Sequence, residues 1–230
     1  MADAKREPPG IPEDVAAIRK EISRFLNSTT VNGKKVGDAK FGVYAFFDYD
    51  GEPIYVGQTN EKLRTRIRRH LTNQRTDAVA MNVLDPFEVA EIEVWPLWDF
   101  QGTSTNDNKA KLFLNSAEYT VFQLALNKSS LRAVLNEKGI APAAAIELPT
   151  SYRARIVPDP LYSQRKHPDI RIVRRAATIA NLARVISERD VSKGLRRTLM
   201  TQAQRLERLA TARYNESGGS IPITKPGDEV

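Results

Sequence analysis

Two short runs of β-forming residues, joined by a turn signal, constrain the fold of this chain more than any other feature. Phe41–Asp48 and Glu52–Gly57 are rich in Val, Ile, Tyr and Phe, and they flank an Asp-Gly pair at residues 50 and 51. An Asp-Gly pair between two such runs is among the strongest short-range signals for a β-hairpin. We therefore expect two antiparallel strands joined by a turn at Asp50-Gly51.

The register of this hairpin decides which side chains share a face. A two-residue turn places Tyr44 opposite Gly57. Phe46 then faces Tyr55, which lies diagonally beside Tyr44 on the same face. The other face is wholly apolar and is expected to be the core side, with Val43, Ala45, Phe47, Ile54 and Val56. The two phenols lie away from that core, either as an aromatic pair that shields the sheet under a helix or as functional groups.

The remaining elements follow from the spacing of apolar residues, which predicts helices at intervals of three and four and strands at intervals of two. The expected helices are 13–27, 61–73, 116–127, a short one at 131–136, and two closing helices with apolar seams that begin at Ile172 and Leu195. Residues 87–98 are expected to form a third strand, and residues 152–157 are either a strand or an extended linker. The fold class is α+β, a small core with a three-stranded antiparallel sheet flanked by helices.

Composition divides the chain into segments. The two ends are charged or rich in Gly and Pro, and the last third is basic and begins with a proline-rich stretch. The expected organisation is a disordered N-terminus at 1–12, a helix and linker at 13–39, a core domain at 40–136, a basic extension with a helical hairpin at 137–214, and a disordered tail at 215–230.

The basic residues of the chain are concentrated in this extension. The net charge is +7, yet residues 151–214 carry fifteen Lys and Arg against five Asp and Glu. Such a segment is a candidate for contact with a polyanion. A cluster around His167-Pro168 is expected to be a phosphate-contacting loop that leads into a helix, the alternative being a merely soluble surface; it comprises Arg165, Lys166, Arg171, Arg174 and Arg175.

Composition also excludes several classes of site. The chain has no cysteine and two histidines, so disulfides, zinc–thiolate sites, cysteine nucleophiles and polyhistidine sites are excluded. A bound metal would therefore be a hard ion with oxygen ligands. No apolar run approaches the length of a membrane span, and the first residues are polar, unlike a signal peptide. We expect an intracellular, cytoplasmic protein.

Two helices carry candidate functional residues. Arg66 and His70 are four residues apart and therefore lie on the same face of their helix. They belong to a basic run at 62–71, in which Arg64 and Arg69 are candidate substrate-binding residues. Glu118 interrupts an apolar stripe, where a carboxylate is costly unless it is paired or bound to a cation. A local alternative is a capping box in which Asn115 is the N-cap and Glu118 bonds a backbone N–H.

Together these residues resemble a known family. The sequence Gly42-Val43-Tyr44, ten residues, then Tyr55-Val56-Gly57, followed by Arg66, His70 and a helical glutamate at 118, resembles the GIY-YIG nuclease domain over residues 40–136. The second element is usually Tyr-Ile-Gly in that family, so Val56 is a conservative departure. The family also has an asparagine that closes the domain; Asn127 and Asn136 are the two candidates for it here.

The resemblance implies hydrolysis of phosphodiester bonds around one Mg²⁺ or Mn²⁺ ion per active site. The implied roles are metal ligand for Glu118, general base or positioning of the attacking water for Tyr44, water orientation or phosphate contact for Tyr55, transition-state stabilisation for Arg66, and a hydrogen bond to the phosphate or Tyr44 for His70. Gly57 would let the backbone approach the substrate. The implied partner is double-stranded DNA.

The target within DNA stays open between two kinds of nuclease. A compact chain with small appendages looks most like a restriction-type endonuclease of host defence, and the alternative is a structure-specific, repair or mobile-element nuclease. A non-catalytic nucleic-acid-binding protein with a vestigial nuclease core is an alternative of another class. The helical seams after residue 172 either form a hairpin against the domain or the interface of a homodimer.

Overall fold

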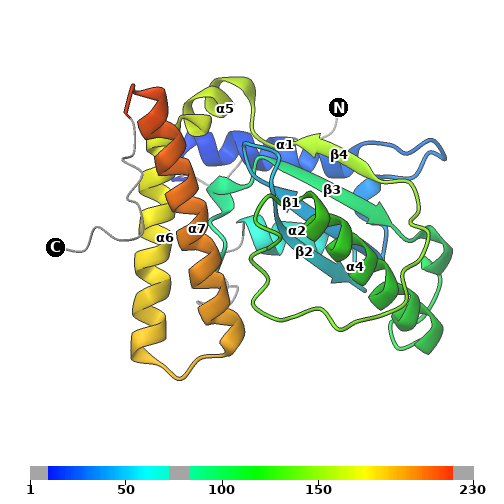
Figure 1. Ribbon diagram of the computed structural model, residues 1–230. Helices are drawn as coiled ribbons and strands as arrows, with labels where there is room; N and C mark the ends of the chain where they lie inside the picture. Colours follow the sequence, from blue (N-terminus) through cyan, green and yellow to red (C-terminus); the bar gives the residue numbers. More distant parts are fainter. Residues whose placement is uncertain (1–9, 73–82, 220–230) are drawn as a thin grey trace.

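The computed structural model describes residues 10–72 and 83–219, and its centre is an antiparallel sheet with strand order β2-β1-β3-β4 (Figure 1). The strands are β1 (Gly42–Phe47), β2 (Pro53–Thr59), β3 (Glu91–Pro96) and β4 (Tyr152–Arg155). The expectation of three strands is wrong, because Tyr152–Arg155 pairs with β3 as a fourth strand. An edge strand needs partners on one side only, so its proline-rich flanks are compatible with pairing.

Helices cover both faces of this sheet. The described helices are α1 (Glu13–Asn27), α2 (Leu63–Thr72), α4 (Asn108–Lys128), α5 (Asp159–Lys166), α6 (Pro168–Glu188) and α7 (Lys193–Glu216). The long helix α4 lies against one face and α1 with α2 against the other, while α6 and α7 form a hairpin at one end of the sheet (Figure 1). Of the described helices, none combines the length and apolar character that a bilayer crossing requires.

Because both faces of the sheet are covered, the expectation of a single core side is corrected. Phe41, Val43 and Ala45 pack with α4, as expected for the apolar face. Tyr44 and Phe46 point the opposite way, into a second core that includes residues of α1 and α2. The tyrosine face is therefore buried as well, and Tyr44 itself is 0% exposed.

The register of the hairpin is as expected, although its turn is not. Tyr44 pairs with Gly57 and Phe46 with Tyr55. However, the N–H of Asp48 donates to the carbonyl of Glu52, so the loop has three residues. An irregularity between Phe46 and Phe47 compensates for the extra residue. It also turns Ile54 into the core of α1 and α2, away from Val56.

Helix α4 begins eight residues earlier than expected. Its N-cap is Asp107, whose carboxylate accepts a hydrogen bond from the N–H of Ala110. Asn115 and Glu118 consequently lie inside the helix, and the capping-box interpretation of Glu118 is wrong. The short helix expected at 131–136 is absent, since these residues form a turn followed by extended chain.

The C-terminal helices are rotated relative to the expected seams. The buried residues of α6 are Arg171, Arg175, Thr178, Leu182 and Val185, one position before the apolar seam that begins at Ile172. In α7 the seam from Leu195 is replaced by Leu195, Thr198, Thr201, Gln202 and Arg205. Polar side chains therefore fill much of this interface. The expectations for residues 1–9 and 220–230, and the last residue of the helix expected at 61–73, lie outside the described residues.

Candidate active site

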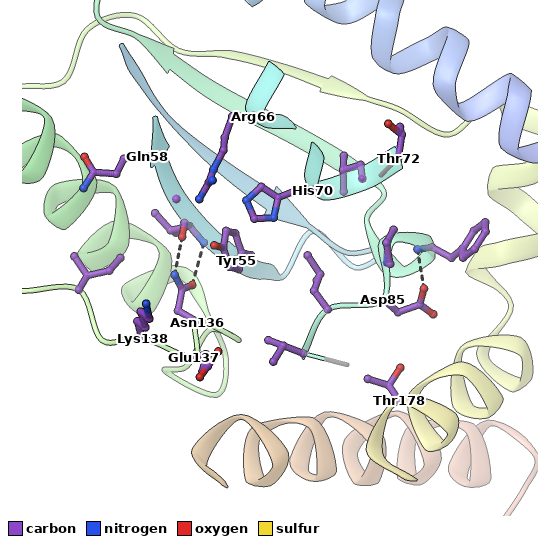
Figure 2. A pocket seen from close by; sticks show the side chains of 18 of the residues that line it. Tyr55, Gln58, Arg66, His70, Thr72, Asp85, Asn136, Glu137, Lys138 and Thr178 are labelled. Carbon is purple, nitrogen blue, oxygen red and sulfur yellow. Dashed lines mark hydrogen bonds between the residues drawn. The ribbon is translucent and has the colours of Figure 1, made fainter. Parts of the chain in front are cut away.

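A cavity of about 1080 Å³ runs along the β2 side of the sheet and brings most of the predicted catalytic residues together (Figure 2). Strand β2 supplies Tyr55 and Gly57, α2 supplies Arg66 and His70, and α4 supplies Glu118. Strand β2 is at the edge of the sheet, so helices from opposite faces can meet beside it. Helices α1 and α6 and the segments 83–87 and 136–141 complete the walls.

Tyr44 does not line the cavity itself but lies behind its wall, where it contacts the lining residue Arg66. Its hydroxyl accepts a hydrogen bond of 3.3 Å from Nε of Arg66. Burial raises the pKa of the Tyr44 phenol well above its ordinary value, and the neighbouring Tyr55 adds to this shift while Arg66 opposes it. The phenol is therefore neutral, and it holds Arg66 in place as an acceptor.

Gly57 has a steric role that the sequence does not reveal. A Cβ atom at this position would lie 2.5 Å from the phenol oxygen of Tyr44 and 3.0 Å from a ring carbon of Tyr55. Both distances are shorter than van der Waals contact. Only glycine leaves the two phenols in their places. Packing within the protein therefore explains the glycine at position 57, and no close approach of a substrate is needed to explain it.

Tyr55 and His70 form an aromatic layer over Tyr44. The ring centroids of Tyr55 and His70 are 5.5 Å apart, and those of Tyr44 and His70 are 5.8 Å apart. Burial, together with the charges of Arg66 and Arg69, lowers the pKa of His70 to about 4. His70 is thus a neutral imidazole, and its Nε2 is buried without a hydrogen-bond partner among the described residues.

Among the carboxylates that line the cavity, Glu118 lies beside Gln58 and Arg66, and its surroundings fit a hard divalent cation. Burial raises its pKa to about 7, against the opposing effects of Gln58 and Arg66. Gln58 lines the same cavity, and its Oε1 is buried without a hydrogen-bond partner among the described residues. One carboxylate and a free amide oxygen suit an ion that keeps several waters. Within residues 10–72 and 83–219 there is no cluster of three or more acidic or histidine side chains that would form a cage.

The structure distinguishes between the two candidate asparagines. The Asn136 side chain accepts a hydrogen bond from the N–H of Val56 and donates one to its carbonyl, at 3.1 and 2.6 Å. Asn136 thereby occupies the free edge of β2 at Val56 (Figure 2). Asn127 instead accepts a hydrogen bond from Arg132 at an exposed position.

The predicted substrate-binding residues of α2 form ion pairs with neighbouring segments. Nε of Arg64 donates to Asp38 at 2.9 Å, and Arg64 also bonds the end of α1. Arg69 pairs with Glu61 at 2.8 Å. Both side chains therefore connect α2 to neighbouring segments of the protein.

The cluster around His167-Pro168 does not form the expected loop, because α5 ends at Lys166 and α6 begins at Pro168. Arg165 pairs with Asp14 and stacks on Phe87. Arg174 makes two hydrogen bonds to Asp85, at 2.8 and 3.0 Å. Lys166 is exposed and has no acidic partner among the described residues.

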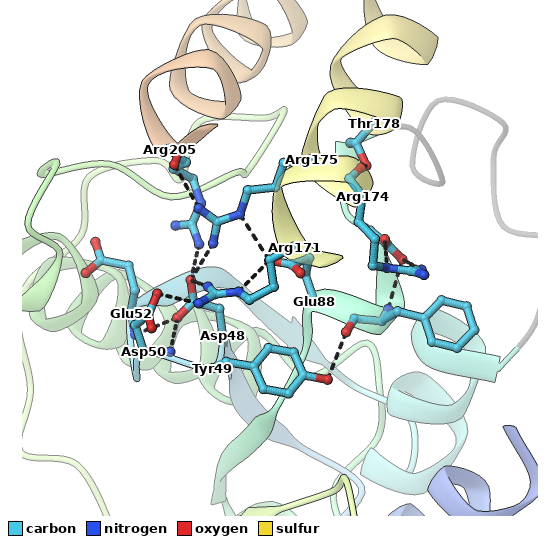
Figure 3. Close-up of polar contacts among 12 residues, drawn as sticks. Asp48, Tyr49, Asp50, Glu52, Glu88, Arg171, Arg174, Arg175, Thr178 and Arg205 are labelled. Carbon is cyan, nitrogen blue, oxygen red and sulfur yellow. Dashed lines mark hydrogen bonds and ion pairs between the residues drawn. The ribbon is translucent and has the colours of Figure 1, made fainter. Parts of the chain in front are cut away.

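Arg171 and Arg175 require a further correction, since they are buried and cannot be part of a phosphate-binding surface. With Arg205 they converge on Asp48, whose Oδ2 lies 3.1, 3.0 and 2.5 Å from the three guanidinium groups (Figure 3). Glu88 lies beside Arg175 at 3.1 Å. This cluster joins α6 and α7 to the turn between β1 and β2.

Sequence reasoning missed the acidic half of this cluster and the role of Arg205. The positions of Arg171 and Arg175, four residues apart, mark one face of a helix, and that face is a signal for a shared partner. Nothing in the sequence connects it to Asp48 or Glu88, which are more than eighty residues away in the chain.

Comparison with known proteins supports the arrangement described above. Residues 40–111 match the model of the GIY-YIG catalytic domain. No curated protein and no solved structure matches the chain. The matched residues include both tyrosines, Gly57, Arg66 and His70, and the structure adds Glu118 from the continuation of α4. Residues 40–111 therefore form a GIY-YIG catalytic domain, which relates this part of the chain to the GIY-YIG nuclease superfamily.

Proposed function

We propose that this protein is a divalent-metal-dependent endonuclease that hydrolyses phosphodiester bonds in DNA. The observation that carries the proposal is the meeting of Arg66, Tyr55 and Glu118 in one cavity at the β2 edge. These residues come from three different elements and line one cavity, where they are available to a metal ion and a phosphate. A nuclease needs a cation for the phosphate, a metal ligand and a group that orients water.

Glu118 would hold one Mg²⁺ or Mn²⁺ ion, with Gln58 as a further oxygen donor. The bound ion would supply Lewis-acid stabilisation of charge on the phosphate and a more acidic water. Glu118 lies in a half-buried position, where an uncompensated carboxylate is costly. A cation beside it removes that cost.

Arg66 would bind the scissile phosphate through the face of its guanidinium group that does not contact Tyr44. Nε is engaged by the Tyr44 hydroxyl, so the group enters the cavity in a fixed orientation. A planar fork held in this way can stabilise the charge that develops on the phosphate. The raised pKa of Tyr44 favours the positioning role over that of general base.

Tyr55 and His70 would contact the attacking water or the phosphate. His70 is neutral, and its free Nε2 can donate or accept a hydrogen bond according to its tautomer. Burial also raises the pKa of Tyr55, so its hydroxyl remains a donor at neutral pH. Both groups can therefore orient a water molecule without a change in charge.

The biological role within this proposal is that of a restriction-type enzyme. It is supported by the C-terminal hairpin, which packs on the nuclease core through the Asp48 cluster and is not an independent module. Double-strand cleavage by one site per chain would require two copies of the protein, so a homodimer belongs to this proposal. A structure-specific nuclease is the alternative.

Cleavage of plasmid DNA in Mg²⁺ tests the proposal. Discrete fragments that depend on the metal are the result expected for a restriction-type enzyme. Cleavage only of branched or flapped substrates would favour the structure-specific alternative. An intact plasmid and intact branched substrates, in both Mg²⁺ and Mn²⁺, would contradict the nuclease activity.

A further inference from the structure

A second groove lies between α1 and α2, on the side of α2 away from Glu118. It has a volume of about 710 Å³ and is lined by Arg19, Ser23, Arg64, Thr65, Arg68 and Arg69. Four arginines from two helices thus face one depression. Helix α2 itself contains no acidic residue.

Two of these arginines, Arg19 and Arg68, form no ion pair with any described acidic residue. Arg64 and Arg69 form ion pairs with Asp38 and Glu61. Arg68 donates to the hydroxyl of Ser23 at 3.0 Å, and Arg19 donates to the carbonyl of Thr72 at 3.1 Å. These acceptors are neutral, so the positive charges of Arg19 and Arg68 remain available.

Arg19 also has a donor that lacks an acceptor. Its Nε is buried, and it has no hydrogen-bond partner among the described residues. A buried N–H without an acceptor is unfavourable, and an anionic oxygen would satisfy it. Neutral hydroxyls at Ser23 and Thr65 offer further contacts to such an anion.

The groove is continuous with the catalytic cavity. Arg19 and Thr72 line both depressions. Arg66, which lines the cavity, and Arg68, which lines the groove, lie on opposite sides of α2, and Thr72 at the end of this helix is common to both depressions. A chain of phosphates that leaves the catalytic cavity past Arg19 would therefore enter the groove.

We propose that the groove between α1 and α2 binds the sugar–phosphate backbone of the DNA substrate beyond the scissile phosphate, with Arg19 and Arg68 as its free cations. The inference rests on the proposed nuclease function and names the path of the strand. It assigns a substrate-binding role to the N-terminal helix, which lies outside the matched residues 40–111.

The test compares three double variants by fluorescence anisotropy with a labelled DNA duplex over a range of salt concentrations, with EDTA present to prevent cleavage. Arg19→Gln with Arg68→Gln removes the two free cations of the groove. Arg184→Gln with Arg208→Gln removes the same charge from exposed positions of α6 and α7. Arg19→Lys with Arg68→Lys keeps the charge of the groove.

The glutamine pair in the groove should reduce the magnitude of the slope of log affinity against log salt by about 2. At ~0.15 M salt the same loss corresponds to about 30-fold weaker binding, since each contact releases about 0.9 counterion. The pair on α6 and α7 and the lysine pair should keep the wild-type slope. Circular dichroism melts of all three variants check that the fold is retained.

Two results would overturn the inference. An unchanged slope for the groove glutamine pair would place the DNA elsewhere, and equal effects of the two glutamine pairs would show a response to net charge alone. Cleavage by the wild type in Mg²⁺ is measured in parallel. A wild type that cuts DNA while the groove pair binds normally would overturn only the groove, whereas a wild type that neither binds nor cuts would overturn the proposed function.

Discussion

The phenol of Tyr44 occupies the space that a side chain at residue 57 would need. The two residues are partners across the β1–β2 ladder, and a Cβ atom at Gly57 would lie 2.5 Å from the Tyr44 oxygen. That oxygen accepts the hydrogen bond of Arg66. The absence of a side chain at 57 therefore determines where Arg66 is held in the cavity.

Gly57→Ala should reduce the rate of cleavage by at least ~10²-fold, because the methyl group displaces the phenol that orients Arg66. Single-turnover cleavage in Mg²⁺ measures this. The matched control is Gly102→Ala, since nothing lies within 4 Å of a Cβ atom there. Equal rates for the two variants would show that Tyr44 does not depend on the glycine.

Arg66→Lys should lose at least ~10²-fold in the single-turnover rate, on the scale of one preorganised contact to a transition state. Lysine keeps the charge but lacks the Nε that bonds Tyr44 and the fork that fits a phosphate. Arg196→Lys, at an exposed position of α7, is the control. A rate for Arg66→Lys within a few-fold of wild type would exclude the forked contact.

Asp48→Asn should lower the free energy of unfolding by about 3–5 kcal/mol, because it leaves three buried guanidinium groups without their shared carboxylate. Urea unfolding measures the loss. Asp50→Asn is the matched control, since Asp50 contacts Arg171 with a side chain that is 55% exposed. A loss no larger than that of the control would mean that the cluster does not hold the C-terminal hairpin in place.

His70 should make the stability of the protein depend on pH. Its pKa is about 4 in the folded state and 6.5 in the unfolded state, so the unfolded state takes up the proton first as the pH falls. Neutral His70 therefore makes its full contribution to the free energy of unfolding above about pH 6.5. Roughly 2 kcal/mol of that free energy is lost when the pH falls to about 5.

Urea unfolding of the wild type and of His70→Gln at pH 7 and pH 5 isolates this contribution, because other groups titrate equally in both proteins. The wild type should lose more stability than the variant over this interval. His167→Gln, at an exposed position, should behave as the wild type. The same pH dependence in all three proteins would show that His70 titrates normally.

The sequence predicts the hairpin register and the residues of the cavity because these follow from local patterns. Tyr44 and Gly57 are paired by the period of two along the strands, and Arg66 with His70 by the helical repeat. The sequence also identifies Glu118 as a candidate functional residue, because its carboxylate interrupts an apolar stripe of the helix. Local spacing could not distinguish Asn127 from Asn136, since the role depends on hydrogen bonds to the distant Val56.

The errors arise where distant segments decide the outcome. A second core forms because α1 and α2 cover the face of the sheet that carries Tyr44 and Phe46. The alternating pattern of a strand does not reveal which helices will cover its second face. The seam of α6 was misplaced because Arg171 and Arg175 are buried against Asp48, and a reading of apolar residues assigns arginines to the surface. The fourth strand depends on pairing with β3 from sixty residues away.

The proposed nuclease function depends on Glu118 as the ligand of the catalytic metal ion. The most direct measurement is single-turnover cleavage of plasmid DNA in Mg²⁺ by the wild type, Glu118→Gln and Glu147→Gln, with metal binding followed by calorimetry. We predict that Glu118→Gln folds, binds DNA as the wild type does, binds no Mg²⁺ and cuts no DNA, whereas Glu147→Gln, changed at an exposed position, retains all activities. Normal cleavage and metal binding by Glu118→Gln would show that Glu118 is not the metal ligand.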